Sequence, residues 1–174
     1  IGKKTSYLVS VRQSYLQLLF KMIKLPFLPT FTDAQFKIKH RFDRNNELTF
    51  LGIAGIDDMK LNTSLDTEKA EYILSYLPTI KQETFTVGAT YRHYVGRHTQ
   101  FYALSHSFMN NKNTKYQGND ESNEENLRLK LRTNEQETKF RFENTSLLGQ
   151  FKLNVGANAE YARYTDDTFA KYYI

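Results

Sequence analysis

The chain has 174 residues, no cysteine, and a formal net charge of +5 from 24 basic and 19 acidic side chains. The absence of cysteine excludes disulfides, thiol catalysis and a Cys-ligated zinc site, and the basic residues are spread along the chain instead of forming the patch expected of a nucleic-acid-binding protein. Although 40% of the residues are hydrophobic, no run of about 18 apolar residues occurs, which excludes a helical membrane protein but not a β-barrel, whose strands face lipid at every second residue.

The first third of the chain predicts three strands. The first covers about residues 4–20, but its alternation fails near Leu16 and gives way to an apolar stretch that ends in residues 25–29. Two prolines in that stretch exclude a central strand and predict a packed rim loop. The second and third strands cover about residues 34–42 and 47–56, around a turn rich in Asp and Asn, which tolerate left-handed geometry.

Four further strands follow. The clearest covers residues 83–94, where apolar and polar side chains alternate over a length that can cross a bilayer, and the next covers about 99–109. In the sixth segment, Leu127, Leu129 and Leu131 have the opposite parity to Phe140 and Phe142, so this segment either contains a bulge or leaves the membrane partway. The last strand covers about residues 150–164 and is long enough to span a bilayer.

The connections between these strands are alternately short and long. Tight turns are predicted at residues 43–46, 95–98 and roughly 145–149, and long connections at roughly 21–33, 57–82 and 110–125. This asymmetry is typical of a transmembrane β-barrel, which has tight periplasmic turns and extended outer loops. We therefore predict an all-β fold, an antiparallel up-and-down meander of about seven strands that forms part of a large transmembrane β-barrel.

Two of the long connections differ in character. Residues 66–78 predict a short amphipathic helix, capped by Asp66 or Thr67 and closed by Pro78. We expect this helix to be a structural element of the barrel rim rather than a lid over its mouth. Residues 110–124 have almost no apolar side chains and predict a solvated, mobile loop.

The alternation assigns side chains to two faces of the strands. The side chains expected to face an aqueous lumen are Arg12, Lys37, Lys39, Arg92, Lys152 and Asn154. The side chains expected to face lipid are Phe85, Val87, Ala89, Tyr91, Phe151, Leu153, Val155 and Ala157. A cationic face cannot lie in a packed core without partners, but it is stable against water.

Aromatic residues gather beside the short turns. They are Phe42 and Phe50 at the first turn, Tyr91, Tyr94, Phe101 and Tyr102 at the second, and Phe140, Phe142 and Phe151 at the third. Barrels carry such residues as a girdle at the membrane interface. The alternative explanation is that aromatic residues simply favour strands.

No catalytic residue, cofactor-binding residue or metal site is expected, and therefore no enzyme. The histidines, His40, His93, His98 and His106, lack the spacing of a metalloprotease. Pairs of aspartates at 57–58 and 166–167 would suit a cation at a loop, but paired acids at strand ends are commonly solvated. The glycines within the strands resemble no phosphate-binding loop.

A further pattern lies in the order of several short segments. They are residues 6–12 (SYLVSVR) followed by Tyr15 and Leu16, 36–39 (FKIK), 46–49 (NELT), 104–112 (LSHSFMNNK) and 160–164 (EYARY). Each alone is a degenerate strand pattern. Together and in this order they resemble the barrel of a TonB-dependent outer-membrane receptor of the Bacteroidetes type, over most of the chain.

This resemblance implies a barrel of about 22 strands, plugged by an N-terminal globular domain, that imports a nutrient ligand across the bacterial outer membrane with energy from the TonB complex. The implied partners are outer-membrane lipid, the remaining barrel and plug, the TonB complex, an unidentified nutrient and a surface lipoprotein, but no nucleic acid. Because the chain shows no plug, no TonB box and too few strands, we expect residues 1–174 to be an internal segment of the barrel domain. The alternative is a soluble antiparallel β-sandwich or small β-barrel that binds a ligand.

Overall fold

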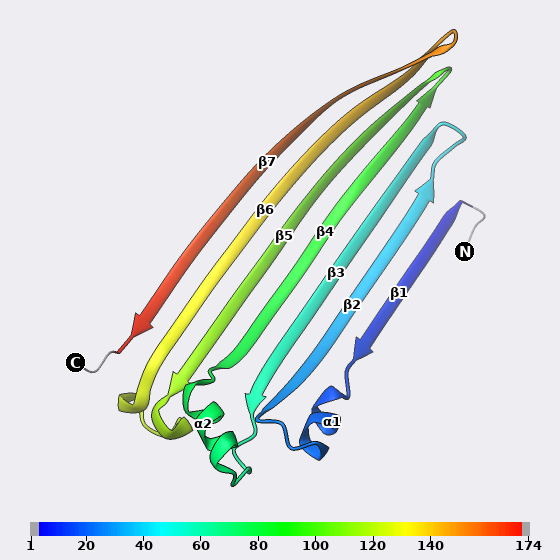
Figure 1. Ribbon diagram of the computed structural model, residues 1–174. Helices are drawn as coiled ribbons and strands as arrows, with labels where there is room; N and C mark the ends of the chain where they lie inside the picture. Colours follow the sequence, from blue (N-terminus) through cyan, green and yellow to red (C-terminus); the bar gives the residue numbers. More distant parts are fainter. Residues whose placement is uncertain (1–3, 172–174) are drawn as a thin grey trace.

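The computed structural model describes residues 4–171 as one antiparallel sheet of seven strands in chain order, with short helices at one end (Figure 1). The strands are β1 (Thr5–Gln13), β2 (Phe27–Arg41), β3 (Asn46–Leu61), β4 (Thr79–Val95), β5 (His98–Tyr116), β6 (Leu127–Leu148) and β7 (Phe151–Ala170). The helical segments are α1 (Leu16–Met22), α2 (Glu68–Tyr76) and the 3-10 turns η1 (Gln117–Asn119) and η2 (Glu124–Asn126). The predicted all-β antiparallel meander is confirmed.

Three short turns lie at one end of the sheet, and the longer connections lie at the other (Figure 1). The second and third turns are two-residue loops that begin at Gly96 and Gly149, with φ values of +58° and +63°. Glycine adopts this left-handed conformation at no steric cost, which is why it dominates such turns. The predicted alternation of connections is confirmed, but the third turn comes later than predicted because β6 continues to Leu148.

The strands extend further toward the helical end than the sequence pattern predicts. Residues 110–116 belong to β5 and pair with β4 and β6 on its two sides. The prediction of a solvated loop over 110–124 is therefore wrong for this part. Backbone hydrogen bonds to two neighbouring strands hold the segment in place whatever its side chains, so its polarity hid the strand.

The segment between β1 and β2 also differs from the prediction. β1 ends at Gln13, and the apolar run that follows forms α1 instead of more strand or a loop. β2 begins at Phe27 and contains Pro29, so the predicted rim loop is wrong for residues 27–29, although this part of β2 is not a central strand. The pairing of β1 with β2 ends at Gln13 and Thr32, so Pro29 has a strand neighbour on the β3 side alone, and such a local edge tolerates proline.

β6 runs without interruption through the segment whose parity changes. Its register with β5 shifts between Lys115 and Tyr116, and from Leu129 to Ser146 the pairing is continuous. Leu129 and Leu131 therefore lie on the face opposite to Phe140 and Phe142. The predicted bulge between these two groups is wrong, and the other alternative, that β6 leaves the membrane partway, stays a prediction.

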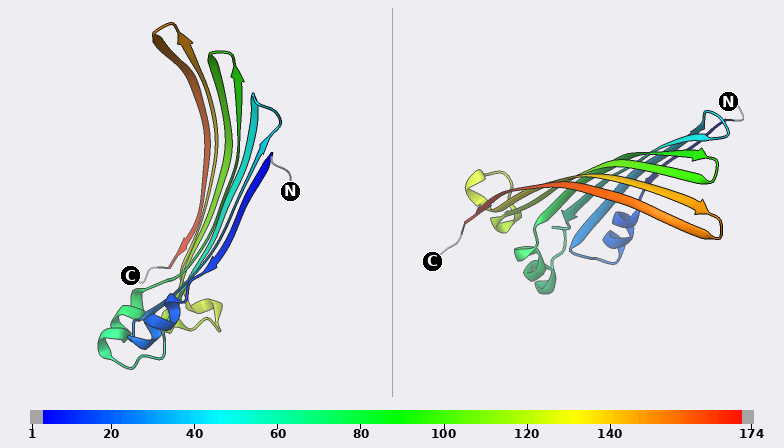
Figure 2. Two further views of the ribbon diagram at one scale, coloured as in Figure 1. Left: turned by 90° about the vertical axis from the view of Figure 1, so that its right-hand side faces the viewer. Right: turned by 90° about the horizontal axis from the view of Figure 1, so that it is seen from above.

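The sheet is a single curved layer, and α1 and α2 lean toward its concave side at the helical end (Figure 2). The predicted helix is confirmed as α2, with the Thr67 hydroxyl accepting a hydrogen bond from the Ala70 amide at 3.3 Å. Apart from Pro26 and Pro29, the buried aliphatic and aromatic side chains of residues 4–171 are Ala70 and Leu74, and both belong to α2. The sheet itself has no core.

Within residues 4–171, no helix combines the length and the apolarity needed to cross a membrane.

Candidate functional site

The register sorts the side chains of the sheet into two faces, because residues paired directly across antiparallel strands point to the same side. One row of paired residues reads Val9, Phe36, Gly52, Val87, His106, Thr138 and Tyr161 from β1 to β7. The register places all eight side chains predicted to face lipid on one face of the sheet and all six predicted to face a lumen on the other. What covers the two faces stays a prediction.

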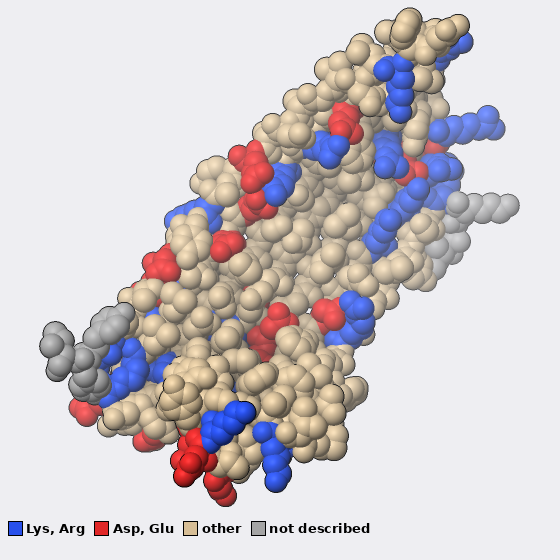
Figure 3. Space-filling model, viewed as in Figure 1, with Lys and Arg blue, Asp and Glu red and all other residues tan. Residues whose placement is uncertain are grey.

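The face with the six polar candidates is the concave one. Figure 3 shows it from the front, with Lys, Arg, Asp and Glu distributed over the length of the sheet. Both views of Figure 2 show that the sheet curves toward this side. The opposite face, which carries the eight apolar candidates, is convex.

Apolar side chains run across the convex face on every strand. One row contains Tyr7, Ile38, Phe50, Ala89, Leu104, Phe140 and Ala159. None of residues 4–171 covers this face, so Val87 remains 45% exposed and Leu153 50% exposed. The Phe36 ring lies directly over Gly52, where a Cβ atom would come within 2.3 Å of it. Neighbouring side chains on this face therefore contact one another closely, but no residue of 4–171 lies over them.

The four histidines lie on the convex face, each bonded to the residue paired with it across the strands. The pairs are His40 with Thr5 (2.8 Å), His93 with Asn46 (2.7 Å), His98 with Ser146 (2.7 Å) and His106 with Thr138 (2.9 Å). A polar group on an apolar face needs such a partner to offset its loss of water. No group of three or more potential metal ligands occurs within the described part of the chain.

Aromatic rings form a short row on the convex face near the turns. The centroids of Tyr91 and Tyr102 are 6.2 Å apart, and those of Tyr102 and Phe142 are 5.0 Å apart, across β4, β5 and β6. Tyr94 and Phe101 lie on the concave face instead, so these two residues do not share a face with the other aromatic residues of the second turn, and the girdle itself stays a prediction. Phe101 receives the guanidinium of Arg92 at 5.3 Å from its centroid, a cation–π contact.

On the concave face near the first turn, Glu47 gathers two cations from β2. Lys39 and Arg41 approach its Oε2 atom at 2.9 Å and 3.2 Å, and its side chain is 6% exposed. Arg92 is paired with Glu47 from the other side, on β4. The structure therefore places Lys39 and Arg92, two of the predicted lumen residues, on the two strands that flank Glu47, and of these two Lys39 makes the ion pair. The sequence analysis did not single out Glu47.

A second charged group lies on β6 and β7 of the same face. Lys139 is 2.9 Å from Glu137 and 3.8 Å from Glu160, and the Arg141 Nε atom donates to Glu143 at 3.0 Å. Sequence analysis missed these residues because the change of parity within β6 did not show which of its side chains point to which face of the sheet. The alternation around Phe140 and Phe142 is the signal that places them.

The remaining predicted lumen residues lie apart from these groups. Arg12 pairs with Asp33 at 2.8 Å near the helical end of β1. Lys152 and Asn154 lie on β7 beside the third turn, at the edge of the sheet. The six candidates thus share a face without forming one cluster.

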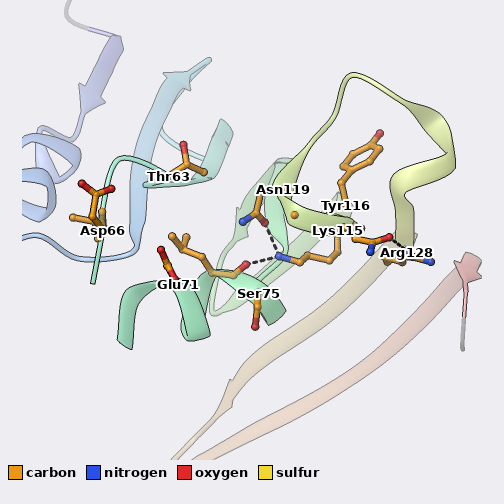
Figure 4. Close-up of a pocket in the computed structure, with 12 residues that line it drawn as sticks. Thr63, Asp66, Glu71, Ser75, Lys115, Tyr116, Asn119 and Arg128 are labelled. Carbon is orange, nitrogen blue, oxygen red and sulfur yellow. Dashed lines mark hydrogen bonds between the residues drawn. The ribbon is translucent and has the colours of Figure 1, made fainter. Parts of the chain in front are cut away.

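At the helical end, a hollow of about 660 Å³ lies between α2, η1 and the start of β6 (Figure 4). Lys115 points from β5 into its wall and is 8% exposed. Its Nζ atom donates to the carbonyls of Leu74 (2.5 Å) and Leu77 (3.0 Å) and to Asn119 Oδ1 (2.6 Å). A cation at the carbonyl end of a helix is favourable, so Lys115 fastens both α2 and η1 to the sheet.

Two carboxylates outside the strands are held in their charged form. The side-chain amide of Asn46, followed by the backbone amide of Asn45, donates to Asp43 in the first turn and lowers the pKa of its carboxyl. The hydroxyl and backbone amide of Ser122 do the same for Asp120. Both interactions close small loops, which is the ordinary role of Asp in turns.

No protein-family model matches this chain, and no curated protein sequence matches it significantly.

Proposed function

We propose that this chain is a segment of the wall of a TonB-dependent transporter in the bacterial outer membrane, which imports a nutrient ligand through a plugged barrel. The observation that carries the proposal is a single-layer sheet with a continuous, uncovered apolar face on its convex side and a charged face on its concave side. Water disfavours an apolar face of this extent, whereas the hydrocarbon of a bilayer covers the outside of a barrel and water fills its inside.

Strand length and loop arrangement support the same proposal. The strands from β2 to β7 have 15 to 22 residues, more than the roughly 9 to 11 that a tilted strand needs to cross a bilayer. We assign the extra length to the helical end, because an outer-membrane barrel extends its strands and loops beyond the membrane on the side of its long connections. β1 and β7 each leave one edge unpaired within the described residues, and further strands would close these edges into a barrel.

The remaining parts of the proposal rest on the resemblance described above. They are the plug on the concave side, the TonB complex as the energy source, a lipoprotein at the outer surface, and the nutrient. We favour this function over a soluble sandwich because a sandwich needs a second layer against the apolar face, and residues 4–171 supply none. No arrangement of a nucleophile, a base and an orienting acid among these residues favours an enzyme.

The proposal is tested by measuring lipid contact one residue at a time. A fluorophore is placed, one position at a time, at residues 85–91 and 151–157 of the protein as expressed in cells. Its quenching by nitroxide-labelled lipid is then measured in bilayers. We expect quenching at Phe85, Val87 and Ala89, and little at the intervening Thr86 and Thr90. Equal quenching at both parities, or none at either, overturns the proposal.

A further inference from the structure

Toward the helical end, the apolar side chains of the convex face give way to charged ones. Lys81 of β4, Lys112 of β5 and Arg132 of β6 are paired directly across these three strands. We call these three residues the cationic row. Asp58 of β3 and Asp167 of β7 are paired with its two outer members, so one acid stands at each end of the row.

The register sets like charges against each other in the cationic row. Side chains paired directly across antiparallel strands have Cβ atoms about 4.5 to 5.5 Å apart, and like charges at that spacing destabilise the sheet. Lys112 has a cation beside it on each side. An anion bound over Lys112 would turn this repulsion into attraction.

Two members of the cationic row have no carboxylate of their own. Lys81 lies 2.9 Å from Glu83, two residues away on the same strand. Among residues 4–171, no carboxylate lies within ion-pair distance of Lys112 or Arg132. Lys112 and Arg132 are therefore available to an anionic group from outside the sheet.

The cationic row lies at a definite depth along the strands. On the proposed function, the pair Val87 and His106 lies near the bilayer midplane, and Lys81 and Lys112 lie six residues further along the same strands. A tilted strand crosses the whole bilayer in roughly 9 to 11 residues, so six residues reach just past the edge of the hydrocarbon. The cations therefore lie at the level of the lipid headgroups, on the side of the long connections.

The side chains between the midplane and the cationic row change from apolar to polar. The rings of Phe85 and Phe108 lie four residues from the row and stack with their centroids 5.1 Å apart. Asn110 and Asn134, paired with each other, lie between these rings and the cations on the same face. Apolar rings, amides and cations follow in the order of the acyl chains, the ester or hydroxyl groups and the phosphate of a lipid.

We propose that the cationic row binds the phosphate of a membrane lipid, centred on Lys112. The inference deepens the proposed function and rests on it, because a lipid reaches this face only where the face meets a bilayer. The three cations span about 10 Å, two strand spacings of about 4.8 Å each, which suits a compact phosphorylated headgroup. Phosphate is bound by Arg and Lys through charge-assisted hydrogen bonds. Asp58 and Asp167 repel a longer polyanion and confine the site to three strands.

The proposal is tested by photocrosslinking in the full protein, expressed in cells that are grown on radioactive phosphate. Benzoylphenylalanine replaces Phe108, a conservative change on the apolar side of the cationic row. Benzophenone inserts into C–H bonds, so a lipid is captured and free inorganic phosphate is not. We expect a radioactive adduct, and mass spectrometry of the cross-linked peptide should find both acyl chains and phosphate on it.

Charge variants distinguish a built site from lipid that merely surrounds the wall. The pair Lys112→Gln and Arg132→Gln should reduce the radioactive adduct several-fold. The pair Lys37→Gln and Lys152→Gln, which removes two exposed cations from the concave face, should leave it unchanged. Asp167→Asn removes the acid at one end of the row and should increase the adduct, a result that misfolding cannot produce. No adduct, an adduct without phosphate, or an adduct that the Lys112 and Arg132 pair leaves unchanged overturns the inference.

Lipid quenching at Val87 and Thr86 in the same charge variants separates this inference from the proposed function. If quenching alternates between the two positions but the captured lipid is insensitive to the cationic row, the inference fails and the transporter proposal stands. If the alternation is absent in the unmodified protein, both fail. Retained alternation in a variant that has lost the adduct shows that the wall is intact and that the lost contact is electrostatic.

Discussion

Val87 and Thr86 are sequence neighbours on β4 whose side chains lie on opposite faces, paired with His106 and Ser107 of β5. The same substitution therefore meets two different environments. On the proposed function, in which the convex face meets lipid and Val87 lies near the bilayer midplane, we expect Val87→Arg to lower the free energy of unfolding in bilayers by about 2 to 4 kcal/mol and Thr86→Arg to lower it much less. Urea titration of both variants measures the difference, and equal effects would contradict the assigned faces.

Lys115 presents a different case, in which one buried cation satisfies acceptors from two elements. Lys115→Met leaves the carbonyls of Leu74 and Leu77 and the side-chain oxygen of Asn119 without this donor. We expect local opening of α2 to become easier by about 1 to 3 kcal/mol, seen as faster hydrogen exchange of the α2 amides. Lys130→Met, at an exposed position of β6, is the matched control. Unchanged exchange in the Lys115 variant would mean that α2 is held by other contacts.

The sequence predicted the two faces well and the contacts of Lys115 not at all. Facing follows from a period of two, and residues such as Val87 and Leu153 report it locally. The acceptors of Lys115 are mainly backbone carbonyls some 40 residues away, and such a contact leaves no local pattern. The ion pairs of Arg41 with Glu47 and of Lys139 with Glu160 also required the register, because each joins residues that share a row across two strands.

Among the elements, the hairpin turns show most directly how local chemistry sets the register. Gly96 has a φ of +58°, and a Cβ atom built there meets nothing within 4 Å. The cost of Gly96→Ala is therefore conformational and should be about 1 kcal/mol. Arg97→Ala, next to it but without a positive φ, should change the free energy of unfolding by less than about 0.5 kcal/mol. Comparable losses in the two variants would contradict this origin.

The strands were predictable where neighbouring side chains alternate and unpredictable where tertiary pairing decides. β4 and β7 show clean alternation of apolar and polar side chains, and the central residues of both strands lie where the sequence predicted them. The polar end of β5, the strand around Pro29 and the helix α1 depend on what lies beside them. A polar segment between two strands is held by its backbone, and a proline is tolerated where one side lacks a neighbour.

As a whole molecule, the sheet lacks the buried apolar surface that stabilises a water-soluble domain. Apart from two prolines, the buried apolar side chains of residues 4–171 are the two in α2, and burial of apolar surface is the dominant favourable term in folding. We expect residues 1–174, produced alone in detergent-free buffer, to show no cooperative thermal transition by circular dichroism. A cooperative transition that is independent of protein concentration would contradict this and would indicate that the chain builds its own core.

The stagger of the turns has a geometric consequence for the whole sheet. The row that begins at Arg41 meets the strands at different distances from their ends. Arg41 is the last residue of β2, but Arg92 lies three residues before the end of β4, and Glu143 lies five residues before the end of β6. Five residues of rise over four strand spacings correspond to an angle of roughly 40°. If the three turns lie in one plane, the strands lean from its normal by this angle, which is the inclination that closes a sheet into a barrel.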